Sequence, residues 1–144
     1  MILFFDTSAL VKLFSNEPGS GKVKKLITDP SNNVWVLELA LIEIQSAIFR
    51  KYRNNEFSEK KLEIVLMAVE KQFEDFTIIP FGSDIIQEAK VLIGQFGKEY
   101  SLRTLDALHV AGWNIVAESA GHFVSSDKNQ MDVVKRMNHK VISV

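Results

Sequence analysis

Four acidic residues occur in stretches of the chain that are otherwise apolar. They are Asp6 after MILFF, Glu43 within LELALIEIQSAI, Asp106 within LRTLDALHVAGW and Asp127 after HFVSS. Acidic side chains are mostly exposed in proteins, so acids in apolar surroundings call for a specific role. If the four carboxylates met in one crevice they would repel one another, and some would keep a proton near neutral pH. A hard divalent cation, Mg²⁺ or Mn²⁺, removes this conflict because it prefers carboxylate oxygens and water as ligands.

Such a site supports phosphodiester hydrolysis. A bound cation can ionise a water molecule to make a nucleophile, orient the phosphodiester and stabilise charge on the leaving oxygen. Ser8 follows Asp6 by two residues and is expected to hydrogen-bond a ligating carboxylate or a water on the metal. It is equally suited to cap the first helix, and the two roles are compatible.

Each acid also has a purely structural interpretation. Asp6 and Asp127 suit helix caps and turns, where aspartate is common. Glu43 can be partly exposed on its helix or paired with an arginine. Asp106 can pair with Arg103 or His109, each three residues away on the same helix. The joint occurrence of the four acids, rather than any one of them, favours a metal site.

The elements that must position these acids alternate along the chain. Apolar runs rich in Val, Ile and Phe predict strands at 1–5, 33–36, 76–81, 122–126 and 140–144. Capping residues and helical spacing predict helices at 8–17, 19–30 and 37–54, and further helices beginning at Ser58, Ser83 and Ser101. This alternation is typical of a three-layer α/β/α domain with a parallel sheet of four or five strands. Two of the acids follow strands, and the carboxyl ends of parallel strands line the crevice where ligands bind.

Composition sets the class of protein. The 144 residues fit one domain spanning 1–144, and 47% hydrophobic with 24% charged residues is ordinary for a globular protein. The chain has no cysteine, which suits a reducing cytoplasm and excludes thiolate metal sites. We expect neither a signal peptide nor a membrane span, since no apolar stretch approaches about 18 residues.

With its four acids in this order, the chain resembles the PIN-domain ribonucleases, and most of all the VapC-type toxins of toxin–antitoxin pairs. The stretches that carry the resemblance are FFDTSALVKLF, LALIEIQSAIFRK, SLRTLDALHVAG and FVSSDKNQ, and together they span nearly the full length. The resemblance implies a PIN-like fold and an acidic quartet of Asp6, Glu43, Asp106 and Asp127 that holds Mg²⁺ or Mn²⁺, with Ser8 as the accompanying hydroxyl. It also implies an RNA substrate, a cognate antitoxin that occludes the crevice, and a homodimer.

One stretch departs from the family pattern. After Asp127 the chain reads KNQMD, without the apolar or aromatic residue often found there in the family. For this reason the role of Asp127 is left open between two alternatives: it ligates the metal directly, or it contacts the metal through a water molecule. Asp132 could replace it, although a surface acid on a helix is the favoured interpretation.

The charge balance is compatible with RNA. With the four site acids set aside, 14 acids face 17 lysines and arginines, so the rest of the chain carries about +3. Candidate phosphate contacts are Lys22, Lys24, Lys25, Arg50, Lys51, Arg53 and Arg103. Binding through such cations weakens as salt is raised.

Three other functions remain to be weighed against a metal-dependent endoribonuclease. A metal-free ribonuclease would use histidines in general acid–base catalysis, but nothing in the sequence brings His109, His122 and His139 together. A phosphatase with an aspartyl nucleophile would need a second acid two residues after Asp6, where Ser8 stands. The third is a catalytically silent PIN-like module that binds RNA or protein, a role that has no use for clustered carboxylates.

Overall fold

The computed structural model describes residues 1–117 and 121–144 as five strands, seven α-helices and one 3₁₀ turn, η1. The strands are β1 (Ile2–Phe5), β2 (Asn33–Leu37), β3 (Thr77–Ile79), β4 (His122–Ser125) and β5 (Lys140–Ser143). The helical elements are α1 (Thr7–Leu10), η1 (Val11–Leu13), α2 (Ser20–Thr28), α3 (Leu39–Arg53), α4 (Glu59–Phe73), α5 (Ser83–Phe96), α6 (Thr104–Val116) and α7 (Lys128–Arg136).

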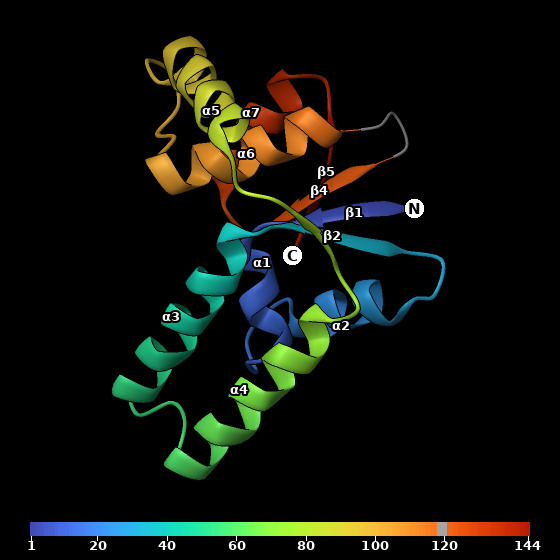
Figure 1. The fold of residues 1–144 in the computed structure, drawn as a ribbon, viewed down its shortest axis with the longest axis vertical. Coiled ribbons are helices and arrows are strands. Elements are labelled where there is room, and N and C mark those ends of the chain that lie inside the picture. The colour runs from blue at the N-terminus through green and yellow to red at the C-terminus, as the bar shows by residue number, and fades with distance from the viewer. Residues whose placement is uncertain (118–120) are drawn as a thin grey trace.

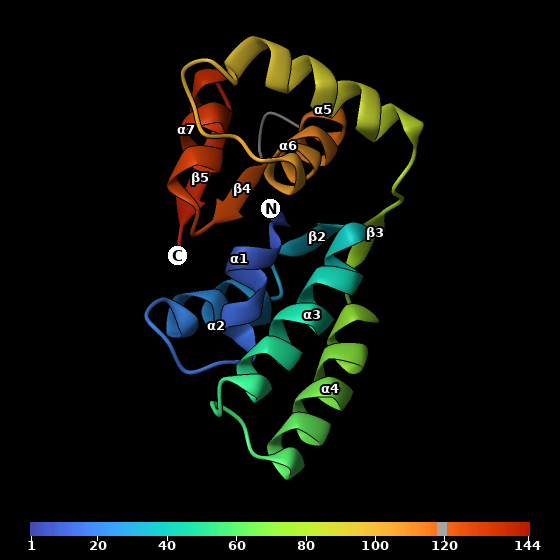
Figure 2. The same cartoon turned by 90° about the vertical axis from the view of Figure 1, so that its left-hand side faces the viewer.

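The strands form one parallel sheet in the order β3-β2-β1-β4-β5. Helices α1 to α4 lie on one face of the sheet and α5 to α7 on the other, which gives three layers (Figures 1 and 2). The chain moves outward from β1 to β3 and then returns to β4 on the opposite side of β1. Between β1 and β4 the strand order reverses, and in parallel sheets this is the place where a crevice opens at the carboxyl ends. The predicted α/β/α class and parallel sheet are confirmed, with five strands.

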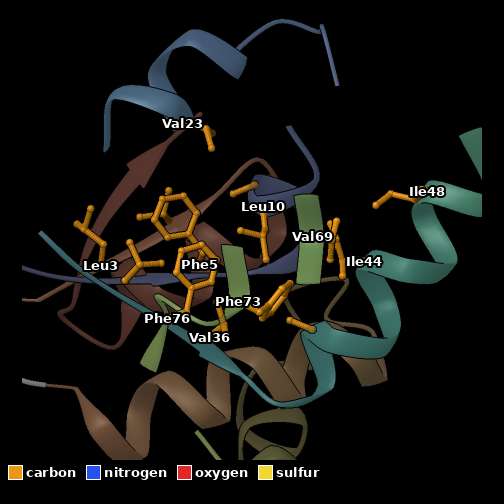
Figure 3. Close-up of a cluster of buried hydrophobic side chains, with 14 of the residues drawn as sticks. Leu3, Phe5, Leu10, Val23, Val36, Ile44, Ile48, Val69, Phe73 and Phe76 are labelled. Atoms are coloured by element: carbon orange, nitrogen blue, oxygen red, sulfur yellow. The ribbon is translucent and has the colours of Figure 1, made fainter. Parts of the chain in front are cut away.

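The first face of the sheet carries a core built from alternate strand residues. Phe5 on β1 and Val36 on β2 point to this side, and both are fully buried. Leu10 of α1 and Ile44 of α3 close over them, as Figure 3 shows. This packing fixes α1 and α3 against the sheet, and these two helices flank the carboxyl end of β1.

The second face uses the intervening strand residues. The rings of Phe4 and Phe123 stack with centroids 5.8 Å apart, and Phe4 also meets Trp113 of α6 at 6.0 Å. Gly112 lets α6 come close, since a Cβ at that position would lie only 3.1 Å from Leu37 Cδ1. The helix that carries the third of the four acids is thereby seated directly on the sheet.

Two predicted helices have different bounds from those expected. The first is short, because α1 ends at Leu10 and the chain tightens into η1, whose side chains pack against the first core. The helix expected from Ser101 begins at Thr104 instead. Arg103 is its N-cap and is extended, with ψ of 164°. The second difference shapes the pocket, since it places Arg103 before the helix rather than within it.

The remaining elements agree with the sequence apart from small shifts. All five strands lie where they were predicted, and Ser58 caps α4 by accepting a hydrogen bond from the backbone N–H of Lys61 at 3.1 Å. Gly82, not Ser83, is the N-cap of α5. No bounds were predicted for α7, although Asp132 was expected to lie on a helix; Asp127 caps this helix. None of the described helices is long and apolar enough to cross a membrane.

Candidate active site

The four acids line one pocket of about 550 Å³ at the carboxyl edge of the sheet. They come from four different parts of the chain: Asp6 follows β1, Glu43 lies on α3, Asp106 on α6, and Asp127 caps α7 after β4. The strand-end pair is brought together by the sheet itself, because the backbone N–H of Asp6 donates to the carbonyl of Val124 at 3.1 Å. Arg50 and Arg103 also line the pocket, so it combines carboxylates with two cations.

Asp6 is buried, and within residues 1–117 and 121–144 only uncharged donors hydrogen-bond its carboxylate. Ser8 Oγ lies 2.9 and 2.7 Å from its two oxygens, Ser125 Oγ donates at 2.9 Å, and the backbone N–H of Ala9 donates at 2.9 Å. The side chain thus caps α1 and faces the pocket at once. Burial raises the pKa of Asp6, against the opposing effects of the nearby charge on His109 and of these hydrogen bonds. The predicted contact of Ser8 with a carboxylate is present, whereas the N-cap of the first helix is Asp6 rather than Ser8.

Asp106 is also buried, but a cation holds it. Arg103 Nε donates to Oδ2 at 2.8 Å and Nη2 lies 3.4 Å from Oδ1. The amide of Gln130, itself 3% exposed, donates to Oδ1 at 2.9 Å. The backbone N–H of Arg103 also donates to Oδ2 at 3.3 Å, so Asp106 helps to start its own helix.

Asp127 lies beside this pair at the entrance to α7. Its Oδ1 accepts from the backbone N–H of Gln130 at 2.9 Å, and its own N–H donates to Ser125 Oγ at 2.9 Å. Arg103 Nη2 lies 3.6 Å from Oδ2. Asp127 is therefore both a helix cap and a member of the pocket, and one arginine bridges it to Asp106.

Glu43 faces the pocket from α3 and is fixed by two side chains. Thr7 Oγ1 donates to its Oε1 at 2.9 Å, and His109 Nε2 hydrogen-bonds the same oxygen. His109 is 2% exposed, and its Nδ1 has no hydrogen-bond partner among residues 1–117 and 121–144. The ring thus connects α6 to α3 across the pocket.

The pairing of Arg103 with Asp106 was among the sequence-based alternatives and is present. Four other residues of the site were not assigned these contacts from the sequence: Thr7, His109, Ser125 and Gln130. Two of them carry a local signal, because Thr7 follows Asp6 directly and His109 lies three residues after Asp106 on one helix face. Ser125 reaches Asp6 from the neighbouring strand β4, and Gln130 reaches Asp106 from helix α7. No spacing in the sequence indicates either contact.

Several other candidate residues lie elsewhere. Lys51 is paired with Glu17 and Glu56, each at 3.1 Å, and does not line the pocket. Asp132 lies 3.9 Å from Lys135 on α7, outside the pocket lining, in keeping with its interpretation as a surface acid. His139 packs on Trp113 rather than approaching the acids. Of the three histidines only His109 lines the pocket, so the arrangement does not favour paired histidine catalysis.

The donor set of the pocket suits a hard divalent cation. All four acids offer oxygen ligands, which Mg²⁺ and Mn²⁺ prefer, within a space that also has room for water. In the described part of the chain, no three His, Asp or Glu side chains are arranged so that they could hold a metal ion together. Arg103 instead forms an ion pair with Asp106, and His109 hydrogen-bonds Glu43. The residues present fit such an ion, provided that the side chain of Arg103 moves off Asp106 and Asp127.

Comparison with known proteins identifies the family. Ribonuclease VapC45 and Ribonuclease VapC49 of Mycobacterium tuberculosis are each 28% identical over 110 residues, which is 76% of this chain and 73% of theirs. The crystal structure of VapBC2 from Rickettsia felis bound to a promoter DNA fragment has a similar fold, with a TM-score of 0.69 at 18% identity, covering 100% of this chain and 99% of that one. Mycobacterium tuberculosis VapC20, a sarcin–ricin loop cleaving toxin, matches with a TM-score of 0.66 at 17% identity over 90% and 93% of the two chains. The model of the PIN domain matches residues 3–136, and the chain therefore belongs to the PIN domain family.

Proposed function

We propose that residues 1–144 form one nuclease domain, a metal-dependent endoribonuclease that is the toxin of a type II toxin–antitoxin pair. The observation that carries the proposal is the convergence of Asp6, Glu43, Asp106 and Asp127 on one pocket from four separate elements. The relatives named ribonucleases and the VapBC complex of similar fold support the same assignment. The absence of cysteine and of an apolar span suits the cytoplasm, where RNA and an antitoxin would be met.

The acids have separate roles in this proposal. Asp6, Glu43 and Asp106 would hold Mg²⁺ or Mn²⁺, and Asp127 would complete the site directly or through water. When bound, the ion supplies a Lewis acid that polarises the phosphodiester and lowers the pKa of water. The protein contributes orientation: Ser8 and Ser125 aim the Asp6 carboxylate, while Thr7 and His109 aim Glu43. Fixed donors of this kind preserve the geometry that an in-line displacement requires.

The RNA backbone would enter along α3. Ser46, Ala47 and Arg50 line the pocket beyond Glu43, so small side chains lead from the acids to an exposed cation. A phosphate flanking the cut site could pair with Arg50, and such contacts weaken with salt. The same pocket is where a segment of an antitoxin would occlude the acids. A homodimer remains part of the proposal.

Cleavage of a mixed RNA pool tests the assignment. We expect cleavage with Mg²⁺ or Mn²⁺, and loss of cleavage with EDTA or with Asp106→Asn. Asp132→Asn is the matched control, because it removes an acid from α7 outside the pocket and should leave cleavage unchanged. Equal cleavage in EDTA would contradict the metal mechanism. Folded protein that binds RNA but cuts nothing under any divalent metal would instead indicate the silent binding module.

A further inference from the structure

Arg103 places its positive charge on two of the four acids. Its guanidinium donates to Asp106 at 2.8 Å through Nε, and Nη2 lies 3.6 Å from Asp127 Oδ2. No other arginine or lysine forms an ion pair with any of the four acids in residues 1–117 and 121–144. The guanidinium thus interacts with the very oxygens that a divalent cation would require.

The two donors on Asp106 differ in how firmly the protein holds them. Oδ1 accepts from Gln130, which is buried with 3% exposure, and Oδ2 accepts from Arg103, whose side chain is 74% exposed. Each carboxylate oxygen has two lone pairs and here accepts two donors: Gln130 and Arg103 Nη2 at Oδ1, and Nε and the backbone N–H of Arg103 at Oδ2. A cation that binds Asp106 must therefore displace a donor. Exposed ion pairs contribute little to stability, whereas a buried amide would be left unsatisfied if it moved. Arg103 is therefore the donor that can leave.

We propose that Arg103 is a movable counter-ion, which closes Asp106 and Asp127 in the metal-free protein and is displaced by the cation onto the phosphate of the substrate. This rests on the proposed nuclease function. In the metal-free state its charge offsets the repulsion between the two carboxylates. Metal and arginine compete for the lone pairs of the same oxygens, so binding of one weakens binding of the other.

The second position of Arg103 follows from its place at the rim. The residue is the N-cap of α6 and lines the pocket together with the acids, so its exposed side chain can turn from the carboxylates toward a bound backbone. A guanidinium presents a planar fork of donors that matches phosphate in a bidentate manner. After displacement it would stabilise negative charge that develops on the phosphate during hydrolysis.

Metal affinity measured without RNA tests the first step. Titration of Mn²⁺ followed by the EPR signal of the free ion gives the dissociation constant for the whole chain. Arg103→Gln keeps the backbone N–H that donates to Asp106 and should bind Mn²⁺ about three- to tenfold more tightly, because a competing charge is gone. Arg103→Lys keeps the charge but not the fork and should fall between the two. Arg136→Gln removes an exposed arginine in the last turn of α7, outside the pocket, and should match the wild type.

Turnover at saturating Mn²⁺ tests the second step. Arg103→Gln should lower kcat about 10- to 100-fold while binding the metal more tightly, a combination that a merely structural role would not produce. Unchanged or weaker Mn²⁺ binding in Arg103→Gln would overturn the counter-ion role, and unchanged kcat would overturn the phosphate contact. Asp106→Asn separates the two proposals. If it binds Mn²⁺ as the wild type does, the metal site itself is wrong; if it does not, failure of the Arg103 variants counts against Arg103 alone.

Discussion

The two strand-end acids show that one pocket contains two kinds of carboxylate environment. Asp6 is 1% exposed and receives only hydroxyl and backbone donors, so its charge is not neutralised by a cation in contact with it. Asp127 is more open and, with Asp106, shares the guanidinium of Arg103. We call Asp6 with its hydrogen-bond donors the Asp6 corner of the pocket, and Asp106, Asp127 and Arg103 the Asp106–Asp127 corner. The contacts of the first are buried in the fold, whereas those of the second depend on an arginine side chain that is mostly exposed to solvent.

The difference between Asp6 and Asp127 shows that the fold is destabilised at Asp6. Burying a carboxylate without a cation is unfavourable, and neutral hydrogen bonds offset only part of that loss. A raised pKa at Asp6 is the consequence. Strongly perturbed carboxyl groups in clefts are typical of functional sites, and an acid that served only to cap α1 would gain nothing from such burial.

The largest effect expected from this comparison is on activity. Asp6→Asn should lower the cleavage rate about 10³-fold or more, because the ion loses its most firmly oriented ligand. The free energy of unfolding should stay constant or rise by about 1 kcal/mol, because a buried charge is replaced by an amide of the same shape. Asp127→Asn should cost only about tenfold in rate, in line with a ligand that acts through water. Initial rates and urea unfolding measure both quantities, and equal losses in the two variants would break the distinction between the corners.

The sequence was sufficient to predict what depends on local pattern. Apolar runs followed by an acid located β1 and β4, and parallel strands necessarily bring their carboxyl ends to one edge. Asp6 and Asp127 could therefore be assigned to one crevice from the strand pattern, whereas Glu43 and Asp106 were added from their apolar helices and from the resemblance to the family. Their role as metal ligands stays a prediction until the variants are measured.

What the sequence could not predict depends on contacts between distant segments. Ser125 reaches Asp6 across 119 residues of chain, and His109 reaches Glu43 across 66. The bounds of α7 were not predicted because the helix opens with the polar stretch after Asp127, which looks like a turn, while its apolar residues come later. The unexpected start of α6 has a similar origin, since the extended conformation of Arg103 is stabilised by Asp106 rather than by its own propensity.

The next effect tests how firmly the Asp6 corner is built. Ser125 Oγ donates to Asp6 and also accepts the backbone N–H of Asp127. Ser125→Ala should lower the free energy of unfolding by about 1–3 kcal/mol, because a buried carboxylate and a backbone donor each lose a partner. Ser126→Ala is the matched control, since its hydroxyl only contacts Ser8 at 3.0 Å and should matter less. If the two alanine variants unfold alike in urea, the Asp6 corner is not held by its hydroxyls.

A third effect concerns pH. Because the pKa of Asp6 is raised above its ordinary 3.8, the unfolded chain loses this proton at a lower pH than the folded protein does. Between those two pKa values stability falls as pH rises, by up to about 1.4 kcal/mol per unit of pH, and above the folded pKa no further loss occurs. Asp6→Asn should abolish this slope in unfolding measured with EDTA present. If the slope survives in Asp6→Asn, Asp6 is ionised as easily in the folded protein as in the unfolded chain.

His139 should give the opposite slope. Burial lowers the pKa of His139, so stability is lost as pH falls below about 6.5. His139→Gln should remove this contribution to the pH dependence of unfolding.

The smallest effect, a change in the free energy of unfolding, is expected at the ion pair between Arg103 and Asp106. Arg103 makes the shortest charged contact to Asp106, yet its side chain is 74% exposed, so solvent screens the pair and the side chain loses freedom when it is held. Arg103→Gln should therefore change the free energy of unfolding by no more than about 0.5 kcal/mol, well below the change in Ser125→Ala. A loss of several kcal/mol would mean that Arg103 is a fixed part of the fold and not a counter-ion that can leave. A small loss would show that the two corners have different roles. Hydroxyls and backbone groups fix the position of Asp6, while Arg103 holds carboxylate oxygens of Asp106 and Asp127 that it must release to the cation.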